Sequence, residues 1–357
     1  MTRLVSAAVG LLLLVASTAR CSPASMGPRE TPPPEKRAFP AVVKGATLRA
    51  VGDDRRGYGT RTARQTMNRL RDLGVNTIGV LLQGRMTHGQ SDEVMGASRG
   101  ELAAVGEALD DARDLGFATV LVPHLYIDDG TWRGYVSFKD PKRAKRWWET
   151  YADFVGTAAA LGEAHGASAL SVGVELKAMS SDPLALVRMG TVVSRVREIY
   201  GGLLTYSANW DEAENVTFWS LVDLVGVNGY YPLVPTPERG AEQTARRLRA
   251  LAESTGKEVL VVEVGYRSSP LSYVRPWEWP EQIEAQVDEA SQAKAWAAVL
   301  THWLPAPGVR GLMAWVIPTD PDDPASEPRH GFNPLNKQAE QVLAEAFRKE
   351  SPTSASR

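Results

Sequence analysis

Short apolar runs alternate with amphipathic segments along almost the whole chain, and this alternation restricts the fold more than any other feature. Eight runs of strand-like composition lie between residues 42 and 316. Each is followed by a segment whose apolar residues recur with the period of a helix. Parallel strands joined by helices are the arrangement that this order predicts. Eight such units in about 300 residues favour an α/β fold, a single closed (β/α)8 or TIM barrel, over an open sheet.

The expected elements can be given by their ranges. The strands are predicted at Val42–Val51, Asn76–Leu82, Ala118–Leu125, Ala169–Val174, Leu203–Ser207, Leu221–Val227, Val259–Val262 and Gly311–Val316. The helices are predicted at Thr62–Leu73, Glu101–Leu115, Pro141–Leu161, Leu184–Tyr200, Val216–Leu221, Glu238–Thr255, Pro280–Leu304 and Lys337–Phe347.

The barrel is expected to be the only folded domain of the 357-residue chain. We predict it over residues 41–347, preceded by a signal peptide at 1–20 and a proline-rich tether at 21–40. Residues 348–357 are predicted to form a disordered C-terminal tail. A hydrophobic content of 43% is sufficient for one large core.

The first residues have the pattern of an export signal. A short basic start at Arg3 precedes an apolar stretch from Leu4 to Ala16, which is too short to span a membrane. Small residues follow, and then the only cysteine, Cys21. This order resembles a bacterial lipoprotein signal with Cys21 as the lipid acceptor, although Arg20 stands where a small residue normally precedes it. We therefore expect an exported protein, either secreted or tethered to the envelope.

Two glutamates close apolar strand-like runs. Glu175 ends Leu170-Ser171-Val172-Gly173-Val174-Glu175, and Glu263 ends Val259-Leu260-Val261-Val262-Glu263. They belong to the fourth and seventh strands and are 88 residues apart, close to the roughly 93 expected for three strand–helix units. Active sites of such barrels lie at the carboxyl ends of the strands. Both carboxyls should therefore face one mouth, as the two carboxyls of a glycoside hydrolase must.

Charge and composition argue against several other kinds of function and site. A formal net charge of −2 gives no electrostatic reason for binding nucleic acid. Five loop aspartates could suggest calcium, but their spacing lacks the glycine and terminal glutamate of a calcium loop, so we interpret them as solvated charges: Asp128, Asp129, Asp320, Asp322 and Asp323. With one cysteine, no disulfide can form within the chain. We expect a monomer without metal or cofactor.

Several longer motifs resemble glycoside hydrolase family 113, a family of clan A. They include Pro123-His124-Leu125 with the loop from Asp128 to Gly134, the segment Tyr206 to Glu212, and Val225 to Leu233. The segments Glu263 to Ser268, Arg275 to Trp279 and Gly331 to Pro334 also match, so the resemblance covers about residues 41–347. That family is known for endo-β-1,4-mannanase activity with retention of configuration. The resemblance implies Glu175 as general acid/base, Glu263 as nucleophile and a mannose-containing polysaccharide or oligosaccharide as substrate.

Other side chains near strand ends are candidates for binding that substrate. Flat aromatic rings pack against the C–H faces of sugars, and amides and imidazoles bind hydroxyls. Packing, or pairing within the loops, is the alternative for each of them. Arg267 and Tyr230 are additionally expected to keep Glu263 ionised, while Glu175 needs the raised pKa of an acid. The candidates are His124, Trp132, Asn209, Trp210, Asn228, Tyr230, Arg267, Trp277, Trp279 and Trp315, the last at the end of the eighth strand.

Val174 departs from the pattern of clan A, in which an asparagine usually precedes the acid/base and contacts the sugar 2-hydroxyl. Valine cannot form that hydrogen bond. Two alternatives to a mannanase therefore stay open. One is a carbohydrate-binding barrel with weak or no catalysis, and the other is a hydrolase of another β-linked glycan of the cell envelope. A simple ion pair between Glu175 and Lys177 is the structural alternative to a catalytic role.

Overall fold

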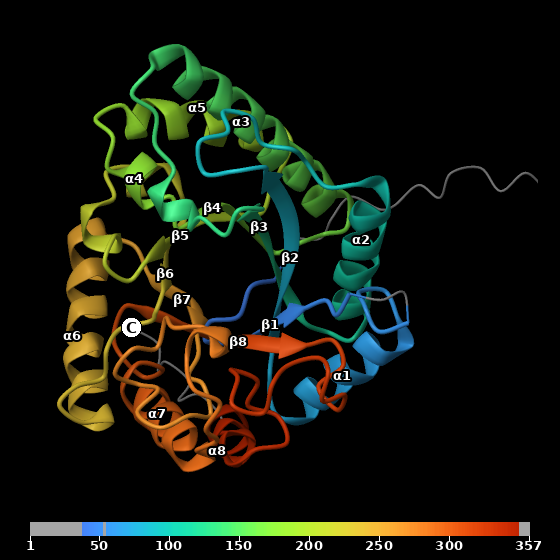
Figure 1. Ribbon diagram of the computed structural model, residues 1–357, viewed down its shortest axis with the longest axis vertical. Helices are drawn as coiled ribbons and strands as arrows, with labels where there is room; N and C mark the ends of the chain where they lie inside the picture. The colour runs from blue at the N-terminus through green and yellow to red at the C-terminus, as the bar shows by residue number, and fades with distance from the viewer. Residues whose placement is uncertain (1–37, 53–54, 350–357) are drawn as a thin grey trace, which may run out of the picture. The chain divides into compact units, whose positions relative to one another are not determined.

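A closed barrel of eight parallel strands forms the centre of the structure, a computed structural model that describes residues 38–52 and 55–349. The strands pair in chain order, and β8 pairs with β1 to close the ring. Helices surround the strands on the outside, as Figure 1 shows. The predicted single (β/α)8 barrel is thus confirmed.

The regular elements follow the predicted order. The strands are β1 (Val43–Arg49), β2 (Thr77–Met86), β3 (Ala118–Ile127), β4 (Ala169–Val174), β5 (Leu203–Asn209), β6 (Leu224–Asn228), β7 (Val259–Val264) and β8 (Val309–Pro318). The helices are α1 (Arg61–Asp72), α2 (Arg99–Asp114), α3 (Pro141–Ala164), α4 (Lys177–Ser180), α5 (Ala185–Arg197), α6 (Pro237–Thr255), α7 (Glu289–His302) and α8 (Gln338–Phe347). Four short 3₁₀ turns are η1 (Arg133–Tyr135), η2 (Ala213–Asn215), η3 (Trp219–Leu221) and η4 (Pro280–Gln282).

Side-chain caps explain where five of the helices begin. Thr60, Ser98, Asp140, Thr236 and Asp288 each stand just before a helix and accept a hydrogen bond from a backbone N–H of its first turn. Such a cap satisfies one of the donors that the first turn leaves without a partner, and typically contributes about 1 kcal/mol. Local sequence therefore sets these boundaries.

Two predicted helices differ from the structure. The segment expected to be helical at Val216–Leu221 contains only η3, and the α-helix that completes the set of eight is the short α4 after β4. The helix expected from Pro280 begins at Glu289, because Asp288 caps it there. Residues 265–288 instead form a long loop after β7, with only η4 inside it.

Most strands continue further at their carboxyl ends than predicted, and β2 and β8 show this with consequences for their neighbours. β2 continues to Met86, and Arg85 forms an additional antiparallel bridge with Met95. β8 continues to Pro318, so Trp315 lies within the strand instead of ending it. The peptide bond between Trp315 and Val316 is cis.

The buried apolar side chains form two layers. One cluster fills the inside of the barrel with residues from the strands, among them Leu81, Val174, Leu260, Met313 and Trp315. The larger cluster lies between the strands and the surrounding helices. Val174 therefore belongs to the packed wall of the barrel directly beside Glu175.

The ends of the barrel unit extend slightly beyond the predicted domain boundaries. Arg310 donates to the carbonyl of Pro40 at 2.7 Å and lies over the ring of Phe39, residues that were assigned to the tether. At the other end, Arg348 donates to the carbonyl of Asp72 at 2.8 Å. The predicted signal peptide, Cys21 and residues 350–357 of the predicted tail lie outside the described residues. Within the described ranges, none of the helices has the length and apolar character needed to span a membrane.

Candidate active site

Glu175 and Glu263 lie at the carboxyl ends of two barrel strands. Glu175 is the first residue after β4, and Glu263 is the penultimate residue of β7. Their side chains are almost fully buried, with residue exposures of 6% and 4%. Burying a carboxyl group is costly unless it has partners or remains protonated. The surroundings of each carboxyl therefore indicate its charge state.

The backbone of Glu175 has an unusual conformation, with a φ of 50°. A left-handed conformation at a residue other than glycine costs on the order of 1 kcal/mol and must be held by its surroundings. Here β5 holds it. The N–H of Glu175 donates to the carbonyl of Ser207 at 2.8 Å, and the N–H of Leu176 donates to the hydroxyl of Tyr206 at 2.9 Å. Tyr206 in turn donates to the buried carboxylate of Glu212 at 2.5 Å.

The carboxylate of Glu175 has three donors. Arg133 Nη2 and Trp132 Nε1 donate to Oε2 at 2.9 and 3.1 Å, and Asn228 Nδ2 donates to Oε1 at 3.0 Å. The contact with Arg133 is also a buried ion pair. Charge-assisted hydrogen bonds of this kind stabilise the ionised form of a carboxyl group.

Glu263 has far fewer partners. Tyr230 donates to Oε2 at 3.1 Å, and Oε1 has no hydrogen-bond partner among the described residues. Burial and repulsion by Glu175 raise the pKa of Glu263 to about 8, although Arg133, Tyr230 and Asn228 act in the opposite direction. Burial and the neighbouring negative charge thus favour the protonated form of Glu263 in the free protein.

This distribution of charge differs from the sequence prediction, in which Glu263 was ionised and Arg267 helped to keep it so. The guanidinium of Arg267 is instead engaged within the β7–α7 loop, where it donates to the carbonyl and carboxylate of Glu278 and to Ser269. It lines a cavity of about 320 Å³ in that loop. The cation at the carboxyl pair is Arg133, and it contacts Glu175.

His124 belongs to the same network. Its Nε2 lies 2.8 Å from Arg133 Nη2, and because a guanidinium can only donate, Nε2 must accept. Burial, and to a lesser extent Arg133, lower the pKa of His124 well below its usual value, so the ring is neutral and carries its proton on Nδ1. Nδ1 is buried without a partner in the described structure. The imidazole can therefore offer one N–H to a substrate.

Aromatic rings surround the two carboxyls. Trp315 is buried in the barrel interior and lies parallel to the His124 ring at a centroid distance of 6.1 Å. Trp132, expected to contact sugar through its ring, uses its indole N–H for Glu175 and packs edge-on against Tyr135. Both rings are thus held close to the carboxyl pair.

Four other predicted residues lie at the end of β5 or in the loops after β5 and β7. The amide of Asn209 is occupied by its own turn, since it donates to Asp211 and accepts from the N–H of Trp210. Trp210 and Trp277 stack at 5.5 Å, and Trp279 packs edge-on against Phe332. Trp277 and Trp279 remain 42% and 46% exposed, so both rings present open surface.

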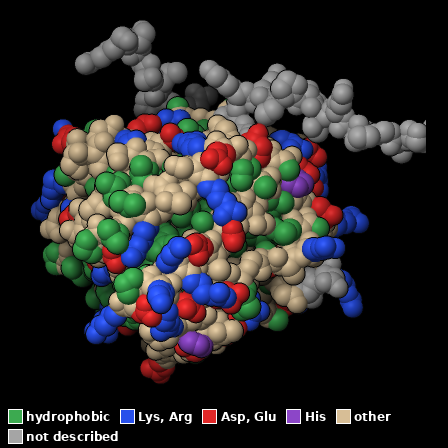
Figure 2. Space-filling view, turned by 90° about the horizontal axis from the view of Figure 1, so that it is seen from above, with side chains coloured by type: hydrophobic (Ala, Val, Ile, Leu, Met, Phe, Trp, Pro, Cys, Tyr) green, Lys and Arg blue, Asp and Glu red, His purple; other side chains and the backbone are tan. Residues whose placement is uncertain are grey.

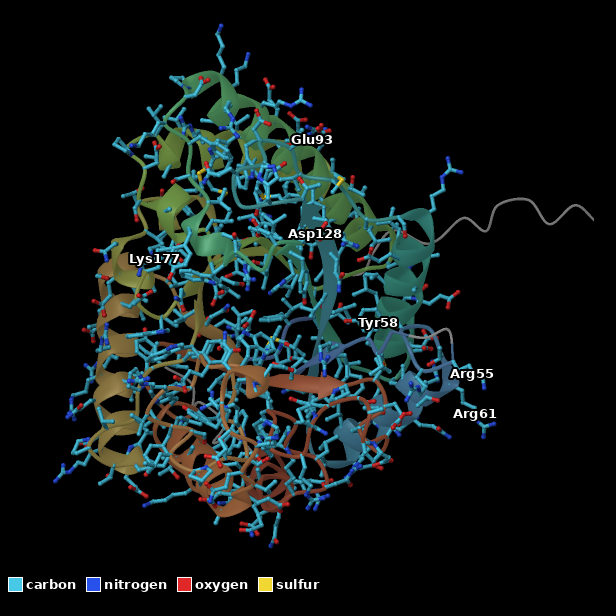
Figure 3. The ribbon with its side chains drawn as sticks, viewed as in Figure 1. Arg55, Tyr58, Arg61, Glu93, Asp128 and Lys177 are labelled. Carbon is cyan, nitrogen blue, oxygen red and sulfur yellow. The ribbon has the colours of Figure 1, made fainter. Side chains whose placement is uncertain are left out.

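The structure thus brings seven of the predicted residues together, by hydrogen bonds or, for Trp315, by its ring contact with His124. They are Glu175, Glu263, His124, Trp132, Asn228, Tyr230 and Trp315. It does not bring Asn209 or Arg267 into contact with either carboxyl. The proposed ion pair of Glu175 with Lys177 is absent. Lys177, labelled in Figure 3 near α4, pairs with Asp211 at 2.5 Å.

Arg133 is the functional residue that sequence reasoning missed. It directly follows Trp132 in a motif that carried the family resemblance, yet an arginine in a loop gives no signal that separates it from a surface arginine. Tyr206 and Glu212 were likewise not selected, although they hold the backbone beside Glu175.

Charged side chains elsewhere are mostly paired and mixed in sign. Figure 2 shows basic and acidic side chains interspersed with apolar ones on the face it displays. Asp128, labelled in Figure 3, pairs with Arg85, while Asp322 and Asp323 pair with Arg69 and Arg56. In residues 38–52 and 55–349, no group of three or more His, Cys, Asp or Glu side chains is arranged to hold a metal ion.

A parallel barrel with two buried glutamates at the ends of its fourth and seventh strands defines the class of barrel glycoside hydrolases. The sequence profile of Glycoside Hydrolase Family 113 matches residues 50–331, and the chain belongs to that family. It is therefore a glycoside hydrolase. A comparison with curated proteins finds no match.

Solved structures of the same family are similar in fold. The GH113 β-mannanase AaManA from Alicyclobacillus acidocaldarius, in complex with ManMIm, is 28% identical, with 86% of this chain and 97% of that chain covered and a TM-score of 0.75. A complex of a GH113 β-1,4-mannanase is 23% identical, with coverages of 87% and 99% and a TM-score of 0.76. A family 5 mannosidase from Rhizomucor miehei is 11% identical, with coverages of 86% and 92% and a TM-score of 0.63. The last two similarities concern the fold alone.

Proposed function

We propose that the protein hydrolyses β-1,4-linked mannan or glucomannan with retention of configuration, with Glu263 as nucleophile and Glu175 as general acid/base. One observation carries this proposal. Glu263 Oε1 is buried without a partner among the described residues, near a carboxylate that has three donors. A buried oxygen of this kind is costly in the free protein unless a ligand or reaction uses it.

The closeness of the two carboxyls supports retention. Asn228 donates to Glu175 and also lies near enough to Glu263 to lower its pKa, and Glu175 repels Glu263 strongly enough to raise it. Retaining enzymes hold their carboxyl groups about 5–5.5 Å apart, whereas inverting enzymes leave room for a water molecule between them. The strong mutual influence of the two carboxyls on their charge fits the shorter separation.

The first displacement requires an ionised Glu263 and a protonated Glu175. The proton that the free pair keeps on Glu263 therefore moves to Glu175 when substrate binds. Glu263 Oε1 then attacks the anomeric carbon, the bond to the leaving sugar breaks, and Glu175 transfers its proton to the leaving oxygen.

In the second displacement Glu175 acts as a general base. It takes a proton from water, whose oxygen attacks the anomeric carbon and releases Glu263 as a carboxylate. His124 Nδ1–H and Asn228 Oδ1, both buried and unpartnered in the described structure, are available to bind sugar hydroxyls. Together they compensate for Val174, whose side chain cannot form a hydrogen bond with a sugar hydroxyl.

Mannan is proposed as the substrate because the 28% identical structure is a β-mannanase. The test is a glycan panel comprising mannan, glucomannan, other β-linked polysaccharides and envelope glycans, assayed for reducing ends. The anomer formed first is read by proton NMR, and Glu263→Gln serves as a control for contaminating activity. We expect β-configured products from mannan or glucomannan. An α product would contradict retention, and activity on another glycan alone would contradict the substrate.

We also propose that the chain is exported, and is either secreted or tethered to the envelope by a lipid at Cys21, on the basis of the N-terminal pattern alone. Mass spectrometry of the mature N-terminus decides between the two. A lipid-modified chain that begins at Cys21 would show the tether. An unmodified chain that begins at Arg20 would contradict lipidation while leaving export intact.

A further inference from the structure

Arg133 occupies an unusual place for an arginine in a loop. It opens η1, between β3 and α3, and its side chain is only 14% exposed. One nitrogen, Nη2, lies 2.9 Å from Glu175 Oε2 and 2.8 Å from His124 Nε2. The guanidinium therefore connects a carboxylate to a neutral imidazole, and both partners are fixed on strands or at a strand end.

His124 holds Arg133 in this position. The imidazole lies in β3, where its ring packs between Tyr126 at 4.8 Å and Trp315 at 6.1 Å. These ring contacts restrict the imidazole, and its acceptor nitrogen faces Arg133. The contact is thus built into the barrel wall and does not depend on a mobile surface side chain.

Building on the proposed function, we propose that Arg133 is a positioning residue that holds Glu175 as a carboxylate and so prepares it as the general base of the second displacement. In the covalent intermediate Glu263 is an uncharged ester, and Glu175 carries the negative charge of the pair alone. A buried carboxylate needs a counter-charge, and Arg133 supplies it. Without Arg133, the carboxylate that Glu175 becomes after it has given up its proton would be buried without a counter-charge.

The hydrogen-bond pattern around Glu175 supports this role. Oε2 accepts from both Arg133 and Trp132, and Oε1 accepts from Asn228, so N–H groups already face both oxygens. Protonation of Glu175 adds a hydrogen to one oxygen and weakens its contact with a donor. The three donors are therefore arranged to bind Glu175 as a carboxylate.

Five other titratable groups act on Arg133 or on the pair, and four of them are neutral near neutral pH. Burial raises the pKa of the three nearby phenols and lowers that of the imidazole, which leaves all four neutral. Burial also raises the pKa of the carboxyl of Glu212, and repulsion by Glu175 acts in the same direction. These groups are Tyr126, Tyr151, Tyr230, His124 and Glu212.

Removing Arg133 should displace the pH dependence of the reaction. The profile of kcat/KM reports the ionisations of the free enzyme, whose active form carries one proton on the pair. Arg133 lowers the pKa of Glu263 and stabilises the Glu175 carboxylate, so its loss makes the pair hold protons to higher pH. Both limbs of the profile should move to alkaline pH by about one unit or more, the size expected for an opposite charge.

The experiment compares wild type, Arg133→Gln, Arg133→Lys and the control Arg146→Gln in the full chain. Arg146 is an exposed arginine of α3 that pairs with Glu93. We expect an alkaline shift for Arg133→Gln, a smaller shift in the same direction for Arg133→Lys, and none for the control. A lower rate at every pH with unmoved limbs would show that Arg133 only supports the fold, and would overturn the proposal.

A second measurement does not depend on turnover. Carbon-13 NMR of protein labelled at the glutamate carboxyls can follow the proton directly, with Glu263→Gln and Glu212→Gln used for assignment. In wild type we expect the signal that titrates near pH 8 to belong to Glu263. In Arg133→Gln we expect this signal to titrate at higher pH. An unchanged titration would contradict the proposal for Arg133. If no glycan is hydrolysed, the proposed function fails while this measurement still decides the role of Arg133.

Discussion

Glu175 and Glu263 stand at equivalent ends of two barrel strands, yet their surroundings differ in every respect that controls charge. Glu175 has three donors, one of them a buried guanidinium. Glu263 has one phenol and an oxygen without a partner in the described structure. The strands deliver two equally buried carboxyls, and the loops then make them unequal. Which loop side chain reaches which carboxyl decides where the proton resides.

The difference can be traced to two arginines. Arg133 lies in the β3–α3 loop and pairs with Glu175, whereas Arg267 follows β7 closely in sequence but is taken by Glu278. Had Arg267 reached Glu263, the two carboxyls would have had similar partners. The pair would then have competed for ionisation, as like charges at close range do. Unequal pairing gives one acid and one carboxylate in the free enzyme.

The largest expected effect comes from removing the carboxyl with fewer partners. Glu263→Ala should lower turnover on polysaccharide by on the order of 10⁴-fold or more, as when other enzymes lose an essential nucleophile. Added azide should restore part of the activity on an activated glycoside and give an inverted product. Steady-state kinetics and NMR of the product measure both. If azide rescued Glu175→Ala with inversion instead, the two roles would have to be exchanged.

Glu175→Ala should have a smaller effect that depends on the leaving group. General acid catalysis typically contributes about 10²–10⁴-fold, so hydrolysis of natural substrates should fall by that factor. Substrates with very good leaving groups need no proton, and their first displacement should be spared. Kinetics on a series of aryl glycosides provides the measurement. An equal loss across the series would argue against Glu175 as the acid.

The pH dependence of the free energy of unfolding tests the raised pKa of Glu263 without any substrate. Folded protein keeps the proton of Glu263 up to about pH 8, whereas the unfolded chain releases it near 4.5. Folding therefore takes up a proton between these values, and stability falls as pH rises through this window. The difference between these two pKa values corresponds to about 5 kcal/mol across the window. Glu263→Gln should be less sensitive to pH across the window in urea unfolding, and identical curves for variant and wild type would contradict the raised pKa.

Tyr230→Phe should weaken the reaction by about 10- to 100-fold, the range for losing a hydrogen bond to a charged group. The variant removes the donor to Glu263 Oε2, and since that bond lowers the pKa of Glu263, the pKa should rise further. Tyr231→Phe is the matched control, because this neighbouring tyrosine packs against Trp210 and Trp303. Comparable losses in the two variants would indicate a packing effect.

Trp132→Phe should have the smallest effect, about fivefold on kcat, because it removes one neutral donor from a carboxylate that keeps two others. The measurement is the separate determination of kcat and KM. A higher KM with unchanged kcat would show instead that the ring serves as a platform for sugar, as its position in a strand-end loop first suggested.

Sequence reasoning located the carboxyls well and their partners less well. Period and strand count placed Glu175 and Glu263 at the same mouth, and Tyr230 does donate to Glu263. Arg267 was expected beside Glu263 but is engaged by Glu278. Arg133 was not selected at all. Nearness in sequence predicts contacts along one strand, but contacts across the barrel mouth depend on how loops of different length fold over each other.

Helix boundaries also divide into those set by local sequence and those set by tertiary packing. Caps such as Thr60 and Asp140 act within one turn, so the starts of α1 and α3 could be predicted to within a residue. The segment after β5 has helical composition at Val216–Leu221 but forms only a 3₁₀ turn. Local propensity is a weak preference there, and packing against the barrel overrides it.

The sequence by itself determined the barrel and the placement of two glutamates at one end of it. Alternating periodicities dictate parallel strands joined by helices, and parallel strands end on one side. Only the tertiary structure decided the charges of those glutamates. Ionisation depends on burial and on donors within a few ångströms. These come from Arg133 in η1, Asn228 at the end of β6 and Tyr230 in the loop after β6.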